Sequence, residues 1–182
     1  DTVVLDKTGT VTQGIPSLTD VMPSEGITSE DLLRFIVAVE TGSEHPLGRA
    51  IVDAAQAQGV NYGKAQEFAA VPGWGVSATV EGRRVLVGTA AFLAEAGVEV
   101  AELERQSTML AKDGRTPIVA SLDGRPLGVL GISDPVKDDS QAAVQRLQAL
   151  GKRVVILTGD HEAAGWATAR EVGVETVLAR VL

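Results

Sequence analysis

The sequence contains no cysteine, and only two of its 182 residues are histidine. The missing cysteines exclude disulfides, zinc ribbons and thiol catalysis. Aromatic residues make up only 3% of the chain. No apolar run approaches the ~20 residues of a membrane helix, so we expect a soluble chain. Basic runs are also lacking and the formal net charge is −8, which argues against nucleic acid as a partner.

Hydrophobic residues make up 45% of the chain, and 20 residues are glycine. This composition is typical of a globular α/β protein. Residues 2–5 form a short β-branched run that ends in a polar loop. After residue 126, apolar runs alternate with helical patterns. The expected elements are strands at 127–132, 154–157 and 174–178 and helices at 138–150 and 162–172. This order predicts a parallel sheet covered on both faces.

The middle of the chain has a different pattern, with amphipathic helices at 32–39 and 46–55 and strands at 76–80, 84–87 and 117–122. Paired strands with two or three helices indicate an α+β unit inserted after the first strand. We therefore predict three segments: residues 1–19 and 127–182 form the parallel domain, and residues 20–126 form the inserted domain.

Three polar segments follow strands of the predicted parallel sheet, where ligands of such sheets bind. They are residues 6–10, 133–135 and 158–160. Asp6 can attack a γ-phosphate if Mg²⁺ and nearby cations neutralise the phosphate oxygens, and Lys7 or Thr158 could steady the transferred group. Alternatively, Asp6 and Thr158 only cap turns at the ends of strands.

The segment Asp6-Lys7-Thr8-Gly9-Thr10 resembles the phosphorylation loop of P-type ATPases, whose first Asp is phosphorylated by ATP. Phosphatases of the same haloacid-dehalogenase-like fold usually have a second, acid/base Asp two residues after the nucleophile. Thr8 occupies that position here. The resemblance therefore implies a phosphoenzyme that persists, as a pump requires.

Residues 43–47 resemble the Ser-Glu-His-Pro motif of the heavy-metal (P1B) ATPases, and residues 73–75 resemble their Gly-x-Gly nucleotide-binding element. Pro46 suits the first turn of a helix, which puts Glu44 and His45 at its N-terminal end. There the His45 imidazole could contact adenine, with Glu44 as an acceptor for the exocyclic amine. In isolation, His45 could equally be a helix-terminal histidine with its own hydrogen bond.

Residues 134–137 resemble the Asp-x-x-Lys hinge segment of this family, and residues 158–160 resemble its Thr-Gly-Asp element. The resemblance covers almost the whole chain and implies two sets of functional residues. The catalytic set is Asp6, Lys7, Thr8, Thr158, Gly159 and Asp160, with Asp6 and Thr8 at the metal; the nucleotide set is Glu44, His45, Gly73, Gly75 and Asp134.

Two positions depart from the family pattern. His161 replaces the usual Asn after Thr-Gly-Asp and is a candidate helix cap, while Thr89 follows Gly88 where Asn is common. The family's second phosphate-binding Lys, its Gly-Asp-Gly-x-Asn-Asp loop, actuator domain and membrane helices are all missing. We therefore expect a fragment that binds ATP with slow or no turnover and self-associates through a sheet edge near Val177 and Val181.

The resemblance thus implies the ATP-binding and phosphorylation portion of a pump at the cytoplasmic face of the plasma membrane. ATP and Mg²⁺ would be its cofactors, and the actuator and membrane domains its partners. An aspartyl-phosphate at Asp6 would drive transport of a transition metal, with copper the first choice. Two alternatives are a soluble haloacid-dehalogenase-like phosphatase with a cap domain and a nucleotide-binding module without turnover.

Overall fold

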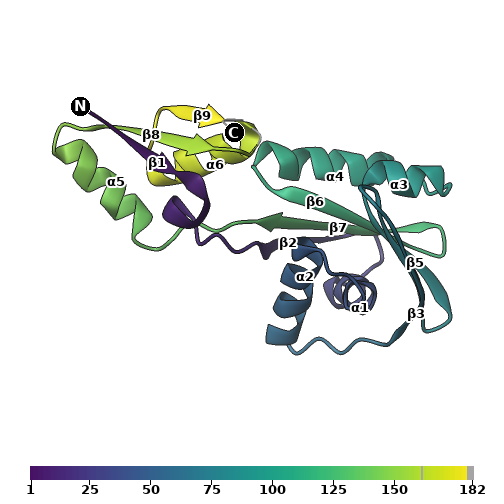
Figure 1. Ribbon diagram of the computed structural model, residues 1–182. Helices are drawn as coiled ribbons and strands as arrows, with labels where there is room; N and C mark the ends of the chain where they lie inside the picture. Colours follow the sequence, from purple (N-terminus) through teal and green to yellow (C-terminus); the bar gives the residue numbers. More distant parts are fainter. Residues whose placement is uncertain (161, 180–182) are drawn as a thin grey trace. The chain divides into compact units, whose positions relative to one another are not determined.

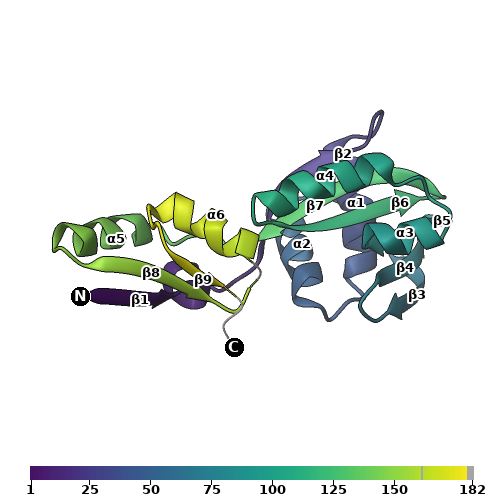
Figure 2. The same ribbon diagram turned by 90° about the horizontal axis from the view of Figure 1, so that it is seen from above.

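Two compact units form the computed structural model, which describes residues 1–160 and 162–179 (Figures 1 and 2). Unit 1 comprises Asp1–Pro16, Ala111–Arg115 and the chain from Ser133 onward. Unit 2 comprises Ser17–Leu110 and Thr116–Ile132. Within the described ranges, no helix is long and apolar enough to cross a membrane.

Unit 1 is built on a parallel sheet in the order β1-β8-β9. The strands are β1 (Thr2–Asp6), β8 (Arg153–Thr158) and β9 (Val177–Ala179), and the helices are α5 (Ser140–Ala149) and α6 (Glu162–Val172). Each strand after β1 follows a helix, as a parallel sheet requires. The register pairs Asp6 with Leu157, so the carboxyl ends of β1 and β8 meet at one edge.

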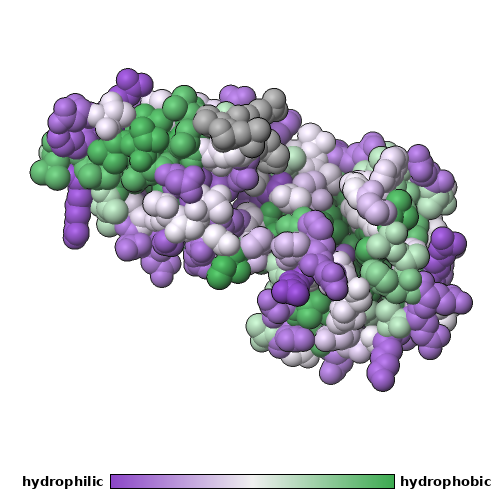
Figure 3. Space-filling model, viewed as in Figure 1, coloured by the Kyte–Doolittle hydropathy of each residue, from purple (hydrophilic) through white to green (hydrophobic). Residues whose placement is uncertain are grey.

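Both described helices of unit 1 pack on the same face of its sheet, which corrects the prediction of cover on both faces. Val154 and Ile156 share a buried cluster with residues of α5 and α6. Val4 and Leu178 belong to the opposite face and are 53% and 49% exposed. Because both connections step across the sheet in one direction, right-handed crossovers put both helices on one side. Figure 3 shows the hydrophobic area over β1 and β8.

Unit 2 contains a six-stranded sheet, antiparallel from β3 to β7, with helices on both faces (Figure 1). Side chains alternate between two buried clusters: Val85 and Val87 pack toward α1 and α2, and Leu86 packs toward α3 and α4. The strands in spatial order are β2 (Ser17–Pro23), β7 (Arg125–Ser133), β6 (Thr116–Leu122), β5 (Arg83–Gly88), β4 (Gly75–Val80) and β3 (Ala65–Val71). The helices are α1 (Ser29–Glu40), α2 (Pro46–Ala57), α3 (Ala90–Glu95) and α4 (Ala101–Lys112).

The prediction was wrong for the strand at 127–132, which belongs to this antiparallel sheet rather than to the parallel one. It is part of β7, which pairs with β6 across the two-residue turn Asp123-Gly124. Both turn residues have positive φ, 50° and 77°, as a tight hairpin requires. A continuous apolar run fits a strand buried on both faces in either kind of sheet. Even so, the parallel sheet with an inserted antiparallel α+β unit confirms the predicted fold class.

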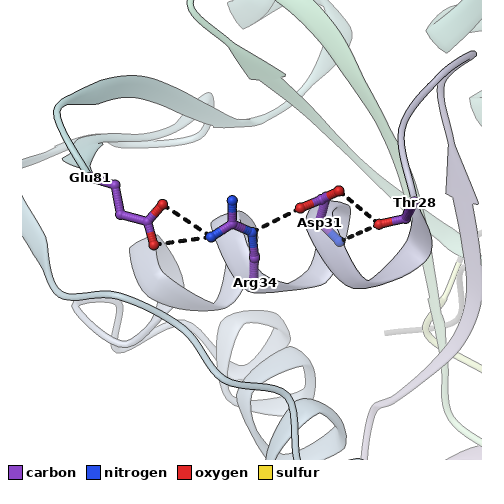
Figure 4. Close-up of polar contacts among 4 residues, drawn as sticks. All are labelled: Thr28, Asp31, Arg34 and Glu81. Carbon is purple, nitrogen blue, oxygen red and sulfur yellow. Dashed lines mark hydrogen bonds and ion pairs between the residues drawn. The ribbon is translucent and has the colours of Figure 1, made fainter.

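Helix α1 begins at a cap that is tied to the β4–β5 turn (Figure 4). The Thr28 hydroxyl accepts a hydrogen bond from the Asp31 amide and donates one to the Asp31 carboxylate. The hydrogen bonds that this carboxylate accepts from Thr28 and Arg34 lower the pKa of Asp31. Arg34 also donates to both carboxylate oxygens of Glu81 at 3.0 Å. These partly exposed pairs hold the helix start in place, and each contributes little stability.

Candidate functional site

The loop after β1 is a closed turn over Lys7–Val11 that leaves Asp6 exposed at the strand end. The Thr12 amide donates to the Lys7 carbonyl at 2.9 Å, which closes the turn. Gly9 has a φ of +75° inside it, a conformation that disfavours side chains. The turn therefore presents the Asp6 carboxylate to solvent on a short, hydrogen-bonded loop.

Lys7 is the buried cation of this edge, with only 5% of the residue exposed. Its ammonium forms an ion pair with the Asp160 carboxylate at 2.5 Å. Thr158, at the end of β8, is 2% exposed, and its hydroxyl accepts from the Asp160 amide at 3.1 Å. The structure thus brings the ends of β1 and β8 together around Asp6, with a paired cation, a buried hydroxyl and an accessible carboxylate.

Asp134 is hydrogen-bonded to the loop that follows Asp6, which we call the Asp6 loop. One carboxylate oxygen accepts from the buried Thr12 hydroxyl at 2.6 Å, and the other accepts from the amides of Gly14 at 2.8 Å and Ile15 at 3.2 Å. The Lys137 ammonium adds a 2.7 Å hydrogen bond to the Gly9 carbonyl. Residues 134–137, the predicted hinge segment, therefore stabilise the conformation of the Asp6 loop.

A metal at this edge would meet only oxygen ligands. Among residues 1–160 and 162–179, no three acidic or histidine side chains form a group suited to holding a metal ion. Asp6 and Thr8, the predicted pair, are both exposed in the loop. Mg²⁺ commonly binds one or two carboxylates and completes its octahedron with water and phosphate oxygens, so this donor pair fits it.

Unit 2 contains a pocket of about 670 Å³. Of the five residues predicted to bind the nucleotide, four line this pocket, and the fifth, Asp134, does not. Glu44 and His45 come from the connection between α1 and α2. Gly73 lies in the turn between β3 and β4, and Gly75 is the first residue of β4. Trp74, which the sequence analysis left out of the site, lies in the same wall and is 39% exposed. A single unit therefore gathers these residues from two segments of the chain.

His45 is the N-cap of α2, with Pro46 at the first helical position. Its Nδ1 accepts a hydrogen bond from the Leu47 amide at 3.2 Å. An accepting Nδ1 carries no proton, so the neutral ring carries its hydrogen on Nε2. His45 therefore does two things at once: it starts the helix with Nδ1 and leaves Nε2–H as a donor for a ligand.

Glycine is required at positions 73 and 75 beside the pocket, for a different structural reason at each. Gly73 has a φ of +78° in a turn closed by the Trp74 amide and the Val71 carbonyl, so a side chain there would be strained. Gly75 pairs with Gly88 across β4 and β5. A Cβ on Gly75 would lie 2.3 Å from the Val87 carbonyl oxygen, so the close strand contact excludes any side chain.

Comparison with known proteins places this arrangement in a family. The model of the haloacid dehalogenase-like hydrolases matches residues 1–181. The chain belongs to this family. Among solved members, a crystal structure of a zinc-transporting PIB-type ATPase in its E2.Pi state superimposes with a TM-score of 0.91 at 35% identity, covering all of this chain and 29% of that one.

Curated relatives of this haloacid dehalogenase-like chain are metal-transporting ATPases. Copper-transporting ATPase 2 of Rhizobium meliloti is 41% identical over all of this chain, and the copper-exporting P-type ATPase of Bacillus subtilis is 42% identical over the same span. The chain spans 22% and 23% of the lengths of these two relatives. The resemblance to P1B-type ATPases is thereby confirmed, and the chain corresponds to one portion of such a protein.

Sequence analysis missed Glu40, which lines the same pocket as His45. It is only 7% exposed, and burial raises the pKa of its carboxyl against the opposing effect of a hydrogen bond from Ser43. Gly48 makes room for it, since a Cβ there would lie 2.3 Å from the Glu40 Oε2. The available signal was a carboxylate directly after the buried run 35–39 of α1, where an apolar residue was expected.

Other predicted positions have structural partners or lie outside the described residues. Thr89 caps α3 by accepting from the Phe92 amide at 3.2 Å, and it also lines the pocket. His161 and Val181, predicted as a helix cap and as part of an exposed edge, lie outside the described residues. Among the described strands, β1 and β9 are the two sheet edges of unit 1, and self-association through them stays a prediction.

Proposed function

We propose that this chain is the ATP-binding and phosphorylation portion of a transition-metal-transporting P-type ATPase. Unit 2 binds ATP in its pocket, and unit 1 carries the phosphate acceptor Asp6. The observation that carries the proposal is the single 670 Å³ pocket whose wall contains Glu44, His45, Gly73 and Gly75. Assigning unit 2 as a nucleotide-binding domain and unit 1 as a phosphorylation domain belongs to the same proposal.

The pocket suits a purine because it joins apolar walls to a few polar groups. Nε2–H of His45 donates to a ring nitrogen or stacks beside the base, and the exposed Glu44 accepts from the exocyclic amine. Glu40 offers a second, more buried carboxyl whose raised pKa favours the protonated form. Gly73 adds an open stretch of backbone, with no heavy atom within 4 Å of where its Cβ would be.

At Asp6, the chemistry is attack of a carboxylate oxygen on the γ-phosphorus of ATP. One P–O bond forms to Asp6, the bond to the β-phosphate oxygen breaks, and ADP leaves with that electron pair. Charge on the transferred group must be neutralised for this step. Lys7 supplies a cation, held by Asp160 at 2.5 Å. Mg²⁺, when bound by Asp6 and Thr8, would supply further neutralisation.

Thr8 favours a lasting phosphoenzyme over rapid hydrolysis. Its position, two residues after Asp6, is the one where an acid/base carboxyl would activate water, and a threonine hydroxyl is a poor general base. A lasting aspartyl-phosphate is useful to a pump, because each protein conformation must be held while the ion moves. The soluble phosphatase alternative loses support for the same reason.

Copper is the ion that the names of the two curated relatives support, since both are called copper ATPases. Their greater length supports the actuator and membrane domains of the same pump as partners, with this portion at the cytoplasmic face of the membrane. In this proposal, the isolated chain binds ATP but turns it over slowly, because Mg²⁺ held by so few protein oxygens would be weakly fixed.

The proposal is tested by calorimetric titration of ATP into the chain and three variants. We expect His45→Ala to weaken binding at least tenfold, about 1.4 kcal/mol. His45→Asn keeps an N-cap acceptor but loses the Nε2 donor, so it should fold like the wild type and still bind weakly. Asp6→Asn should bind ATP normally. Absence of ATP binding by the wild type, or normal binding by both His45 variants, would overturn the proposal.

A further inference from the structure

Phe68 is an aromatic side chain in the pocket of unit 2 that the sequence motifs do not include. It lies on β3, the edge strand of the sheet, and 38% of the residue is exposed. Its ring contacts the backbone of Gly42, where an added Cβ would approach three ring atoms at 3.0–3.3 Å. Gly42 therefore leaves room for the Phe68 ring in the wall of the pocket.

A β-bulge decides which way Phe68 faces. Gln66 pairs with Thr79, but the next pair joins Ala69 to Ser77, so β3 uses three residues where β4 uses two. The extra residue reverses the alternation along β3. Phe68 then shares a side with Ala70, which also lines the pocket. In an unbroken strand, Phe68 would share a side with Gln66 and face away from the pocket.

The backbone at this bulge is strained. Glu67 has a φ of 52°, in the left-handed region that side chains other than glycine rarely adopt. The Thr79 hydroxyl donates to its carboxylate at 2.9 Å across the strands and holds the bulge in place. Strained conformations of this kind persist where the surrounding structure requires them, often at binding sites.

We propose that Phe68 is the aromatic wall against which the base of the bound nucleotide packs, and that the bulge at Glu67 aims the ring at it. This inference rests on the proposed function, which puts a nucleotide in this pocket. The flat ring offers a face to any purine, and the apolar residues around it exclude water from the contact. Phe68 thus binds the base, while Glu67 positions Phe68.

The test compares the affinities of the full chain and its variants for ATP, ADP and AMP by calorimetry. Phe68→Ala should weaken all three by the same factor, about tenfold, because the three share the base. Phe68→Tyr should bind like the wild type. Deletion of Glu67 should also weaken binding although Phe68 remains. Met109→Ala, which removes a 57% exposed side chain of unit 2 outside the pocket, is the matched control and should change nothing.

Circular dichroism and thermal melting check that each variant is folded. If the deletion of Glu67 unfolds unit 2, a comparison of Phe68→Leu with Phe68→Tyr replaces it, and only the leucine variant should lose affinity. Normal binding by Phe68→Ala, alongside weakened binding by His45→Ala, would overturn this inference and leave the proposed function intact. A wild-type chain that binds no nucleotide would overturn the proposed function itself.

Discussion

Substituting Gly48 by alanine should have opposite effects on stability depending on the residue at position 40. An alanine Cβ would lie 2.3 Å from the Glu40 Oε2, so the buried carboxyl must move. Overpacking of this kind costs about 1–3 kcal/mol. Alanine in a helix gains about 0.5–1 kcal/mol over glycine, so the net loss should be at most about 2.5 kcal/mol. In a Glu40→Ala background the nearest remaining atom is the Ser43 Cβ at 3.3 Å, a much milder contact, so Gly48→Ala should stabilise unit 2.

The measurement is urea denaturation of four proteins, namely the wild type, the two single variants and the double variant, which together give the coupling energy between positions 40 and 48. A second cycle with Glu40→Gln separates shape from charge. Glutamine has the size of glutamate, so Gly48→Ala should still destabilise that background. Equal destabilisation by Gly48→Ala in the Glu40→Ala and wild-type backgrounds would refute the steric argument.

Two further predictions concern the carboxyls at the two sites. Asp134→Ala should destabilise unit 1 by about 1–3 kcal/mol, because the buried Thr12 hydroxyl loses its charged acceptor. The amides of Gly14 and Ile15 lose the same acceptor, so faster hydrogen exchange there would localise the loss, and unchanged exchange would contradict it. Glu40→Gln should stabilise unit 2 more at pH 7 than at pH 4. Because burial raises the pKa of Glu40, the Glu40 carboxyl of the folded wild type holds its proton more readily than that of the unfolded chain. The wild type therefore loses stability as pH rises above about 4.5. A difference in melting temperature between Glu40→Gln and the wild type that does not change with pH would argue against this.

Local sequence signals were sufficient for most of the elements of this fold. Apolar spacing predicted α1 and α2, and Pro46 marked the first turn of α2, because both signals are local. The Thr28 cap of α1 was not predicted. The Asp123-Gly124 turn was visible as well. Its consequence, that β7 pairs back onto β6, was missed because an apolar strand carries no mark of the sheet it joins.

The site was predictable where motifs are contiguous and unpredictable where the fold creates the contact. The segments holding His45 and Gly73 were found as motifs, and both line one pocket. Glu40 was missed because only burial by α2 makes its carboxyl unusual. The direction of Phe68 depends on a one-residue bulge, and no alternation pattern predicts where a strand will accept an extra residue.

The order in which the two units can fold follows from the position of β2 beside β7. Because β2 and β7 are neighbours in the sheet, the chain enters and leaves unit 2 on adjacent strands. Unit 2 is nearly continuous in sequence and can form first. Its formation joins the two ends of a loop whose closure otherwise costs about 4 kcal/mol of chain entropy. The β1–β8 pair should therefore form after unit 2 has folded. A substitution that slows the folding of unit 2 should also slow the formation of the Asp6 loop.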